Sequence, residues 1–458
     1  MMATTAYYNI QNRWLLLRCL LVIAGVLVSN IAHAQTKQVF AHYMVCFTPY
    51  SGTVDGYKRD IQDAQRVGID GFALNCGDWN TQYKQNTANM FEAARQLNTN
   101  FKLFFSADQT GGLWYEWVLD MVKTYAKHPN YFNYKGRPFL SAWTGGRKEY
   151  KNEWLSLAIN PLKKAGYNVY FIPFMFPTPV TATPDYALVL KNYSLWWSGF
   201  LDGYYFFGAG GLPDYDSKNP MLRAAEAYAK VFHDSTKTFM SSVIPQYWGA
   251  KQGKGRRYFD LKGGEGLAKQ WQSVIEIQKP EWMELVTWND WDEFSYFSPM
   301  DDINKYNPYT EYKQPGFHHT HKGFAELNKY YIQWYKKGKK PAIKNDNLYF
   351  FYRTYPKDMV AVNDPQGPVT ERFGDIQDEI YVTTILKNPA TLSVISGGVK
   401  AQFSVGKGIV HTRIPFHTGA QSFELSRGDH TLLSAEGEPI LEKSRLYDFD
   451  MYSGYAAN

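Results

Sequence analysis

Two acidic residues, Asp290 and Glu293, lie three positions apart in the segment TWNDWDEFSYFSP, residues 287–299, directly after the apolar run MELV. Cleavage of a glycosidic bond requires two carboxyl groups, one to protonate the leaving oxygen and one to activate water or attack the anomeric carbon. Three residues of chain span at most about 10 Å, which covers both the inverting separation of roughly 6.5–9.5 Å and the shorter retaining one. We therefore expect Asp290 and Glu293 to form a catalytic pair.

Polar and aromatic residues also follow the ends of apolar runs elsewhere in the chain. We expect these residues to bind substrate: His42, Asn75, Asp108, Trp143, Tyr247, Trp248, Trp288, Asn289 and Trp291. Sugar sites combine aromatic platforms for apolar C–H faces with carboxylate and amide groups for hydroxyls. Aromatic residues make up 17% of the chain, but tyrosine and tryptophan also fill ordinary cores, so each is either platform or packing. Asp108 is the reserve candidate for acid–base chemistry.

No metal or cofactor is expected. The cluster HHTH, His318 to His321, lacks a second group of ligands at a recognisable spacing. Two carboxyl groups also hydrolyse a glycosidic bond without a cofactor.

Eight apolar runs precede residue 300, with helical patterns between them. The runs are VFAHYMVCF, IDGFALN, FKLFFSAD, RPFLSAW, NVYFIPFMF, FLDGYYFFG, TFMSSVIPQYW and WMELVTWND. They are almost continuously apolar, as strands buried on both faces of a parallel sheet must be. The helical patterns are YKRDIQDAQRVG, MFEAARQLN, AAEAYAKVF, GLAKQWQSVIEIQ and, last, GFAELNKYYIQWYKKG.

This alternation predicts a (β/α)8 barrel over residues 35–340. The active site of such a barrel lies at the carboxyl ends of its strands, where the candidate residues stand. An open doubly wound sheet is the alternative, but no glycine-rich phosphate loop follows the first strand.

After Pro341 the pattern changes to short strand-like pieces separated by turn residues. Examples are NLYFFYR, EIYVTTIL, TLSVIS, AQFSV, IVHTRIPF and SFELS. Residues 341–458 are therefore expected to form a β-sandwich accessory domain. Such a domain either binds glycan or buttresses the barrel, and we favour the second role.

The N-terminal segment, residues 1–34, is typical of a secretory signal peptide. Arg13 and Arg18 flank WLLL, the apolar run CLLVIAGVLV follows, and AHA at Ala32 to Ala34 suits cleavage before Gln35. An uncleaved membrane anchor is the rival interpretation, but the run is shorter than the roughly 20 residues of a spanning helix. We expect an exported protein, extracellular or periplasmic, that is not inserted in a membrane.

Charge and cysteine content argue against a nucleic-acid-binding protein and against a fold held by disulfides. Removing residues 1–34 takes away two arginines and no acid, so the formal charge falls from +6 to +4, and no nucleic-acid partner is implied. The basic run KKGKK, residues 336–340, suits the end of a helix. Cys46 and Cys76 allow one disulfide, but none is expected. We expect a monomer that acts on a polysaccharide.

Several of these motifs together resemble glycoside hydrolase family 71, the α-1,3-glucanases or mutanases. They are VFAHYMV, YKRDIQDAQRVGIDGFALN, FKLFFSAD and LVTWNDWDEFSYF. The resemblance covers nearly the whole chain after residue 34. It implies an inverting endo-hydrolase of α-1,3-glucan, built as a barrel with a C-terminal β-sandwich, whose catalytic residues correspond to Asp290 and Glu293. Within this pair we assign Glu293 as the acid and Asp290 as the base.

Two positions depart from the family pattern. Asp292 stands where the family usually has glycine, and Phe294 where it has serine. An additional carboxylate raises a neighbour's pKa by like-charge repulsion if it lies nearby, or points into solvent. The alternatives to an α-1,3-glucanase are an enzyme like the endo-α-mannosidases, which share a tryptophan–asparagine signature on the last strand, and a glycan-binding protein without catalysis.

Overall fold

The computed structural model describes residues 37–109, 114–143, 150–175, 185–208, 221–250, 256–301, 303–306 and 317–458. The expected signal peptide, residues 1–34, lies outside these residues. Residues Gln38–Asn458 form one compact unit.

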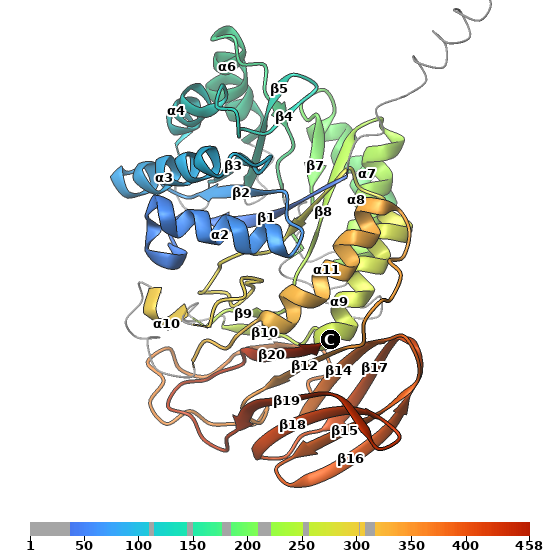
Figure 1. Ribbon diagram of the computed structural model, residues 1–458. Coiled ribbons are helices and arrows are strands. Elements are labelled where there is room, and N and C mark those ends of the chain that lie inside the picture. Colours follow the sequence, from blue (N-terminus) through green and yellow to red (C-terminus); the bar gives the residue numbers. More distant parts are fainter. Residues whose placement is uncertain are drawn as a thin grey trace, which may run out of the picture. The chain divides into compact units, whose positions relative to one another are not determined.

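All eight apolar runs contribute strands to one nine-stranded sheet (Figure 1). Those strands are β1 Gln38–Met44, β2 Gly71–Cys76, β3 Lys102–Asp108, β5 Arg137–Trp143, β6 Tyr170–Phe171, β7 Gly203–Tyr205, β8 Thr238–Val243 and β11 Trp282–Leu285. The ninth strand, β4 Asn133–Tyr134, pairs antiparallel with β5. The seventh run divides into β8 and a separate short strand, β9 Tyr247–Trp248.

The sheet is curled, because its last strand lies beside its first. β11, the last strand, pairs with β1, the first, while β2, β3, β5 and β6 follow on one side and β8 and β7 on the other. All pairs among these eight strands are parallel. β6 and β7 stand at the two ends of this order. Backbone hydrogen bonds join their segments, from Asp202 N to Phe171 O (3.0 Å) and from Tyr205 N to Pro173 O (3.2 Å). The protein is thus a mixed α/β structure built on a strongly curled parallel sheet.

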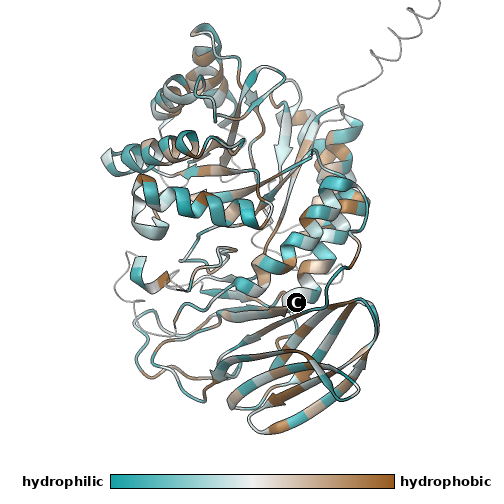
Figure 2. Cartoon of the chain, in the orientation of Figure 1, coloured by the Kyte–Doolittle hydropathy of each residue, from teal (hydrophilic) through white to brown (hydrophobic). Residues whose placement is uncertain are grey.

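Helices connect successive strands, as the sequence predicts. They are α2 Val54–Arg66, α3 Thr81–Leu97, α4 Tyr115–Tyr125, α5 Tyr150–Glu153, α6 Asn160–Lys164, α7 Tyr186–Asn192, α8 Met221–Asp234, α9 Gly263–Gln272, α10 Ile303–Tyr306 and α11 Lys322–Lys337. Four short segments have other helical forms: Pro49–Gly52, a 3-10 helix, and Trp154–Ile159, Tyr193–Trp197 and Ser273–Gln278, which are π-helical. Hydrophilic and hydrophobic residues alternate along α2 and α11 (Figure 2), as expected for helices that pack one face against a sheet.

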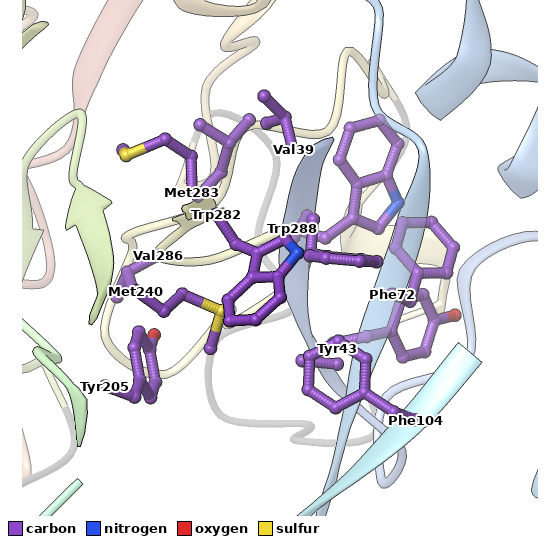
Figure 3. Close-up of a cluster of buried hydrophobic side chains, with 14 of the residues drawn as sticks. Val39, Tyr43, Phe72, Phe104, Tyr205, Met240, Trp282, Met283, Val286 and Trp288 are labelled. Atoms are coloured by element: carbon purple, nitrogen blue, oxygen red, sulfur yellow. The ribbon is translucent and has the colours of Figure 1, made fainter. Parts of the chain in front are cut away.

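The inner face of the curled sheet has an aromatic layer. Side chains alternate between the two faces of a strand, so residues two apart share a face. Phe40 contacts Phe104 with ring centroids 5.0 Å apart, and Phe139 contacts Trp282 at 5.1 Å. Phe104 and Trp282 are drawn in Figure 3. His42 and Glu284 lie two residues beyond Phe40 and Trp282, so they share this face nearer the carboxyl ends of the strands.

After residue 341 the chain forms two four-stranded antiparallel sheets. The first contains β17 Gly408–Pro415, β14 Glu379–Leu386, β12 Asn347–Arg353 and β20 Met451–Ala457, in that order. The second contains β16 Val399–Val405, β15 Ala390–Ser396, β18 Gly419–Arg427 and β19 His430–Ile440. Their side chains share one hydrophobic cluster, in which the rings of Phe350 and Phe423 stack at 3.9 Å. A third, small sheet is formed by β9, β10 Arg257–Phe259 and β13 Glu371–Phe373.

Helices α9 and α11 pack against the first of these antiparallel sheets (Figure 1). Two glycines allow the start of α9 to approach it closely. A Cβ atom on Gly264 would lie 2.4 Å from Thr383 Oγ1 and 2.7 Å from Phe351 Cε2. Gly263 has a φ of +52°, a conformation that glycine adopts more easily than other residues. The glycine pair in LKGGEG is therefore required by the packing of the C-terminal strands.

Candidate active site

The candidate pair lies on one turn that begins directly after β11. Asp290 Oδ1 accepts hydrogen bonds from the backbone N–H groups of Glu293 (2.9 Å) and Asp292 (3.1 Å). The Asp290 N–H donates to Thr287 Oγ1 (2.8 Å). The side chain of Asp290 thus holds the turn that carries Glu293.

Residues from β9 hold Glu293 from the opposite side. The Tyr247 hydroxyl donates to Glu293 Oε1 (2.8 Å), and the backbone N–H of Trp248 donates to Glu293 O (2.9 Å). The guanidinium of Arg257 lies 5.4 Å from the centre of the Tyr247 ring. Tyr247, expected to bind substrate, is therefore a direct partner of Glu293.

Both carboxyl groups have raised pKa values. Burial raises the pKa of Asp290 to about 7, and the negative charges of Asp292 and Asp108 act in the same direction. Burial and the charge of Asp290 raise the pKa of Glu293 to about 7, against the opposing effects of Tyr247 and Arg257. Two nearby carboxyl groups that resist ionisation can share one proton near neutral pH, which is the state that acid–base catalysis by a pair requires.

A row of four polar residues crosses the inner face of the curled sheet. His42 Nδ1 lies 2.5 Å from Glu284 Oε1, and Asn75 Nδ2 lies 3.0 Å from His42 Nε2 and 3.3 Å from Asp108 Oδ2. Each of the strands β11, β1, β2 and β3 supplies one member. His42, Asn75 and Asp108 were all expected to bind substrate, and the structure brings them together. His42 is fully buried and both of its ring nitrogens have protein partners, so it orients Asn75 instead of binding substrate.

The donor in each hydrogen bond of this row follows from the chemistry of the side chains. The amide nitrogen of Asn75 can only donate, so it donates to His42 Nε2, and His42 Nδ1 donates to Glu284. The second N–H of the amide donates to Asp108. The negative charge of Asp108 raises the pKa values of both Asp290 and Glu293, so the row ends within electrostatic range of the candidate pair.

Aromatic side chains stand beside this row. Trp143, at the end of β5, and Phe207, two residues beyond β7, are only partly buried, and their ring centroids are 6.2 Å apart. The His42 ring meets the edge of Phe207 at 5.2 Å. Trp143 and Phe207 are therefore the candidates for a surface on which a sugar ring can stack.

Three tryptophans that were expected to bind substrate are instead fully buried. Trp288 packs on Phe72 (Figure 3). Its indole N–H donates to Asp60 Oδ1 of α2 (2.6 Å). Trp291 stacks on Phe47 at 5.2 Å. Trp248 contacts Phe449 at 5.2 Å, and its exposed fraction is 0%. None of the three presents a ring face to a sugar, so we correct their assignment from platform to packing.

Asn289 also has a different role from the one expected. Its Oδ1 accepts from Met44 N (2.8 Å), and its Nδ2 donates to Met44 O (3.0 Å) and Phe47 O (3.2 Å). It is fully buried, so it holds the end of β1 against the loop of the candidate pair instead of binding substrate.

Glu284, Phe207 and Arg257 were not identified from the sequence. Glu284 had a usable signal, because a charged residue inside an apolar strand must face a polar partner. Phe207 lies in an apolar run, where a phenylalanine looks the same as a core residue, and Arg257 lies in a segment without a recognisable motif.

Two histidines of the HHTH cluster pair with acidic residues, and the two cysteines are not joined in a disulfide. His319 contacts Glu438 (2.7 Å) and Asp448 (3.0 Å), while His321 contacts Asp450 (2.9 Å). Among the described residues, no group of three histidine, cysteine, aspartate or glutamate side chains is arranged to hold a metal ion. Cys46 and Cys76 are free thiols, and burial together with the charge of Asp290 raises the pKa of Cys46 to about 12.

Hydrolysis of a glycosidic bond is the chemistry for which this loop is equipped, because it supplies two carboxyl groups that can share one proton near neutral pH. The chain belongs to glycosyl hydrolase family 71, whose model matches residues 35–458, and is a glycoside hydrolase.

Two curated relatives cover most of the chain. A glucan endo-1,3-alpha-glucosidase of Schizosaccharomyces pombe is 30% identical, over 95% of this chain and 98% of its own. A mutanase of Penicillium rubens is 28% identical, over 92% of this chain and 89% of its own. Among solved structures, an endo-alpha-mannosidase of Bacteroides thetaiotaomicron matches 66% of this chain and 97% of its own, with 14% identity and a TM-score of 0.49.

Proposed function

We propose that this chain is an exported endo-hydrolase of α-1,3-glucan that inverts the anomeric configuration, with Asp290 and Glu293 as its catalytic pair. The single observation that carries the proposal is the placement of both carboxyl groups on one turn at the carboxyl end of the curled sheet, each with a pKa of about 7. The names of its two curated relatives support the substrate.

In the proposed mechanism, Glu293 protonates the leaving glycosidic oxygen and Asp290 removes a proton from the attacking water. Asn75 and Asp108 bind sugar hydroxyls, and Trp143 with Phe207 supports a sugar face. The mechanism requires one group of the pair to be protonated and the other ionised, so activity falls as the pH rises above about 7 and the acid loses its proton.

The proposed architecture is a closed (β/α)8 barrel over residues 35–340 and a β-sandwich over residues 341–458. The hydrogen bonds between β6 and β7, and the core shared by the two antiparallel sheets, support it. Export would follow from cleavage after Ala34, which intact-mass analysis of the secreted protein tests. None of the described helices combines the length and apolarity needed to cross a bilayer.

One experiment tests substrate and stereochemistry together. Purified protein is incubated with α-1,3-glucan, α-1,4-glucan, β-1,3-glucan and α-mannan, and the new reducing ends are followed by NMR. Only α-1,3-glucan should be cleaved, and the β-anomer should appear before mutarotation, because an inverting enzyme delivers water from the opposite face. An α-anomer formed first would exclude inversion, and cleavage of α-mannan alone would favour the endo-α-mannosidase alternative. Binding of a glycan without cleavage would identify a glycan receptor.

A substrate whose leaving group needs no proton distinguishes the catalytic acid from the catalytic base. Asp290→Asn and Glu293→Gln should each lower kcat on α-1,3-glucan by about 100-fold or more, since either exchange keeps the shape and ends proton transfer. Fluoride leaves without protonation, so Glu293→Gln should still turn over an oligosaccharide α-fluoride, whereas Asp290→Asn should not. The opposite pattern would exchange the two roles, and near-normal activity of either variant on glucan would remove that residue from the pair.

A further inference from the structure

Asp450 directly precedes the last strand, β20, and its fully buried carboxylate collects four hydrogen-bond donors. Asp450 Oδ1 accepts from Gln246 Nε2 and from His321 Nε2 (2.9 Å). Asp450 Oδ2 accepts from the backbone N–H of His319 (2.8 Å) and lies 2.8 Å from the Tyr296 hydroxyl. The donors come from the segment before β9, the loop of the candidate pair and the segment before α11.

Gln246 connects this carboxylate to the candidate pair. Its Nε2 also donates to Phe294 O (2.9 Å), and its Oε1 accepts from Met451 N (2.9 Å), so every polar atom of the side chain has a partner. The next residue, Tyr247, donates to Glu293 Oε1, and Phe294 directly follows Glu293. Gln246 is therefore connected to both partners of the Tyr247–Glu293 hydrogen bond, because it precedes Tyr247 in the chain and its side chain bonds Phe294 O, next to Glu293.

The loop beyond Glu293 contacts the same carboxylate a second time. The Tyr296 ring stacks on His321 with a centroid distance of 3.8 Å and an interplanar angle of 12°. His321 Nδ1 lies 2.6 Å from Tyr296 O. Phe294, which has a φ of +50°, stacks on His318 at 4.5 Å. The segment that carries Glu293 is thus held at two points by groups that converge on Asp450.

An ionised carboxylate suits this position better than any neutral group. Burial alone would raise the pKa of Asp450, but the His321 charge and the His319 charge and backbone N–H outweigh burial and lower the pKa below its ordinary value. A carboxylate has acceptor sites for four donors, whereas an amide replaces one acceptor atom with a donor that would face other donors.

We propose that Asp450 is a positioning residue for catalysis: through Gln246 and Tyr296 it holds the loop of Glu293 in the orientation in which Tyr247 bonds the Glu293 carboxyl group. The inference rests on the proposed function of Asp290 and Glu293. The strands after residue 341 would thus contribute one positioning residue, Asp450, to the proposed active site.

The test is a double-mutant cycle in the full-length protein with α-1,3-glucan as substrate. Asp450→Asn and Gln246→Ala should each lower kcat by about 10-fold to 100-fold while KM changes by less than about twofold. The double variant should lose less activity than the product of the two single losses, because both changes break the Gln246–Asp450 hydrogen bond. The matched control is Glu438→Gln, since Glu438 contacts His319 in the same cluster but does not contact Asp450, and its kcat should stay at the wild-type value.

Several results would overturn the inference. One is a normal kcat in Asp450→Asn despite a lowered Tm; another is multiplication of the two kcat losses in the double variant, which would show independent effects. If Asp450→Asn does not fold, Gln246→Ala alone decides, because it leaves the other three donors of Asp450 in place. Glu293→Gln is measured in parallel: full activity there refutes the proposed function, whereas inactivity there with normal activity in Gln246→Ala refutes only the positioning role.

Discussion

Asp290 combines two properties that oppose each other in a folded protein. Its carboxyl group is buried beside Asp292 and Asp108, which disfavours its charge, yet the proposed base must be charged to accept a proton. Two backbone N–H groups that donate to Oδ1 compensate in part. A residue held in this way serves catalysis at a cost in stability.

This cost predicts a pH-dependent gain in stability for Asp290→Asn. The pKa of Asp290 rises from 3.8 to about 7, so the folded state binds its proton more tightly, and stability is lost as the pH rises from about 4 to about 7. Asparagine keeps the acceptor for the turn and carries no charge. Thermal unfolding should show equal stability of variant and wild type at pH 4, and a variant more stable by about 2–4 kcal/mol at pH 8.

The control for this measurement is Asp358→Asn, because the side chain of Asp358 is 82% exposed. Its stability should match the wild type at both pH values. An Asp290→Asn variant that is less stable than the wild type at pH 8 would show that the charged carboxylate stabilises the turn, contrary to the argument from burial.

Among the elements, the start of α9 shows how packing constrains a sequence. The helix contributes to the wall around the curled sheet on one side and meets β12 and β14 on the other. Gly263 and Gly264 occupy the point of closest approach, where a side chain has no space. The glycines lower the intrinsic stability of the helix, so its formation depends on the strands that it contacts.

Substitution at this contact should therefore be costly even when it is small. Gly264→Ala places a methyl group against Thr383 and Phe351, and we expect a loss of about 1–3 kcal/mol in the free energy of unfolding. Gly406→Ala is the matched control, because nothing lies within 4 Å of a Cβ atom there, and its stability should change by less than about 0.5 kcal/mol. Chemical denaturation measures both, and equal stability of the two variants would contradict the packing argument.

Over the whole molecule, the strands after residue 341 are continuous with the rest of the hydrophobic core. Tyr349, Phe351 and Tyr381 belong to the same buried cluster as the curled sheet. Asp450 adds a polar connection to the candidate site. The boundary near residue 341 is thus a boundary in the chain but not in the packing.

Deleting residues 341–458 should therefore give an insoluble or unfolded product, because it exposes the apolar faces of α9 and α11. Cutting the chain without removing this segment is the informative comparison. Lys344 and Asn345 are exposed, so a protease site inserted between them should yield a nicked protein that stays associated and retains most of its activity. A soluble and active product of residues 35–340 would show that the two parts are separable.

The sequence by itself determined the order of elements and the position of the candidate pair. Eight strands and the connecting helices were predicted because near-continuous apolar runs and helical periodicity are local properties of the chain. Asp290 and Glu293 were identifiable because three residues cannot lie far apart. The family resemblance, carried by local motifs, was confirmed by a match over residues 35–458.

Only the tertiary structure decided which side chains face the site. Trp143, Trp248, Trp288 and Trp291 all lie at or beyond the ends of apolar runs, yet among these four only Trp143 is partly exposed. The sequence does not distinguish them, because strands buried on both faces do not reveal which face is the inner one. The same ambiguity concealed Glu284. The contact between Gln246 and Asp450 joins residues 204 positions apart, and no local pattern encodes it, since it exists only when strands from both ends of the fold have packed together.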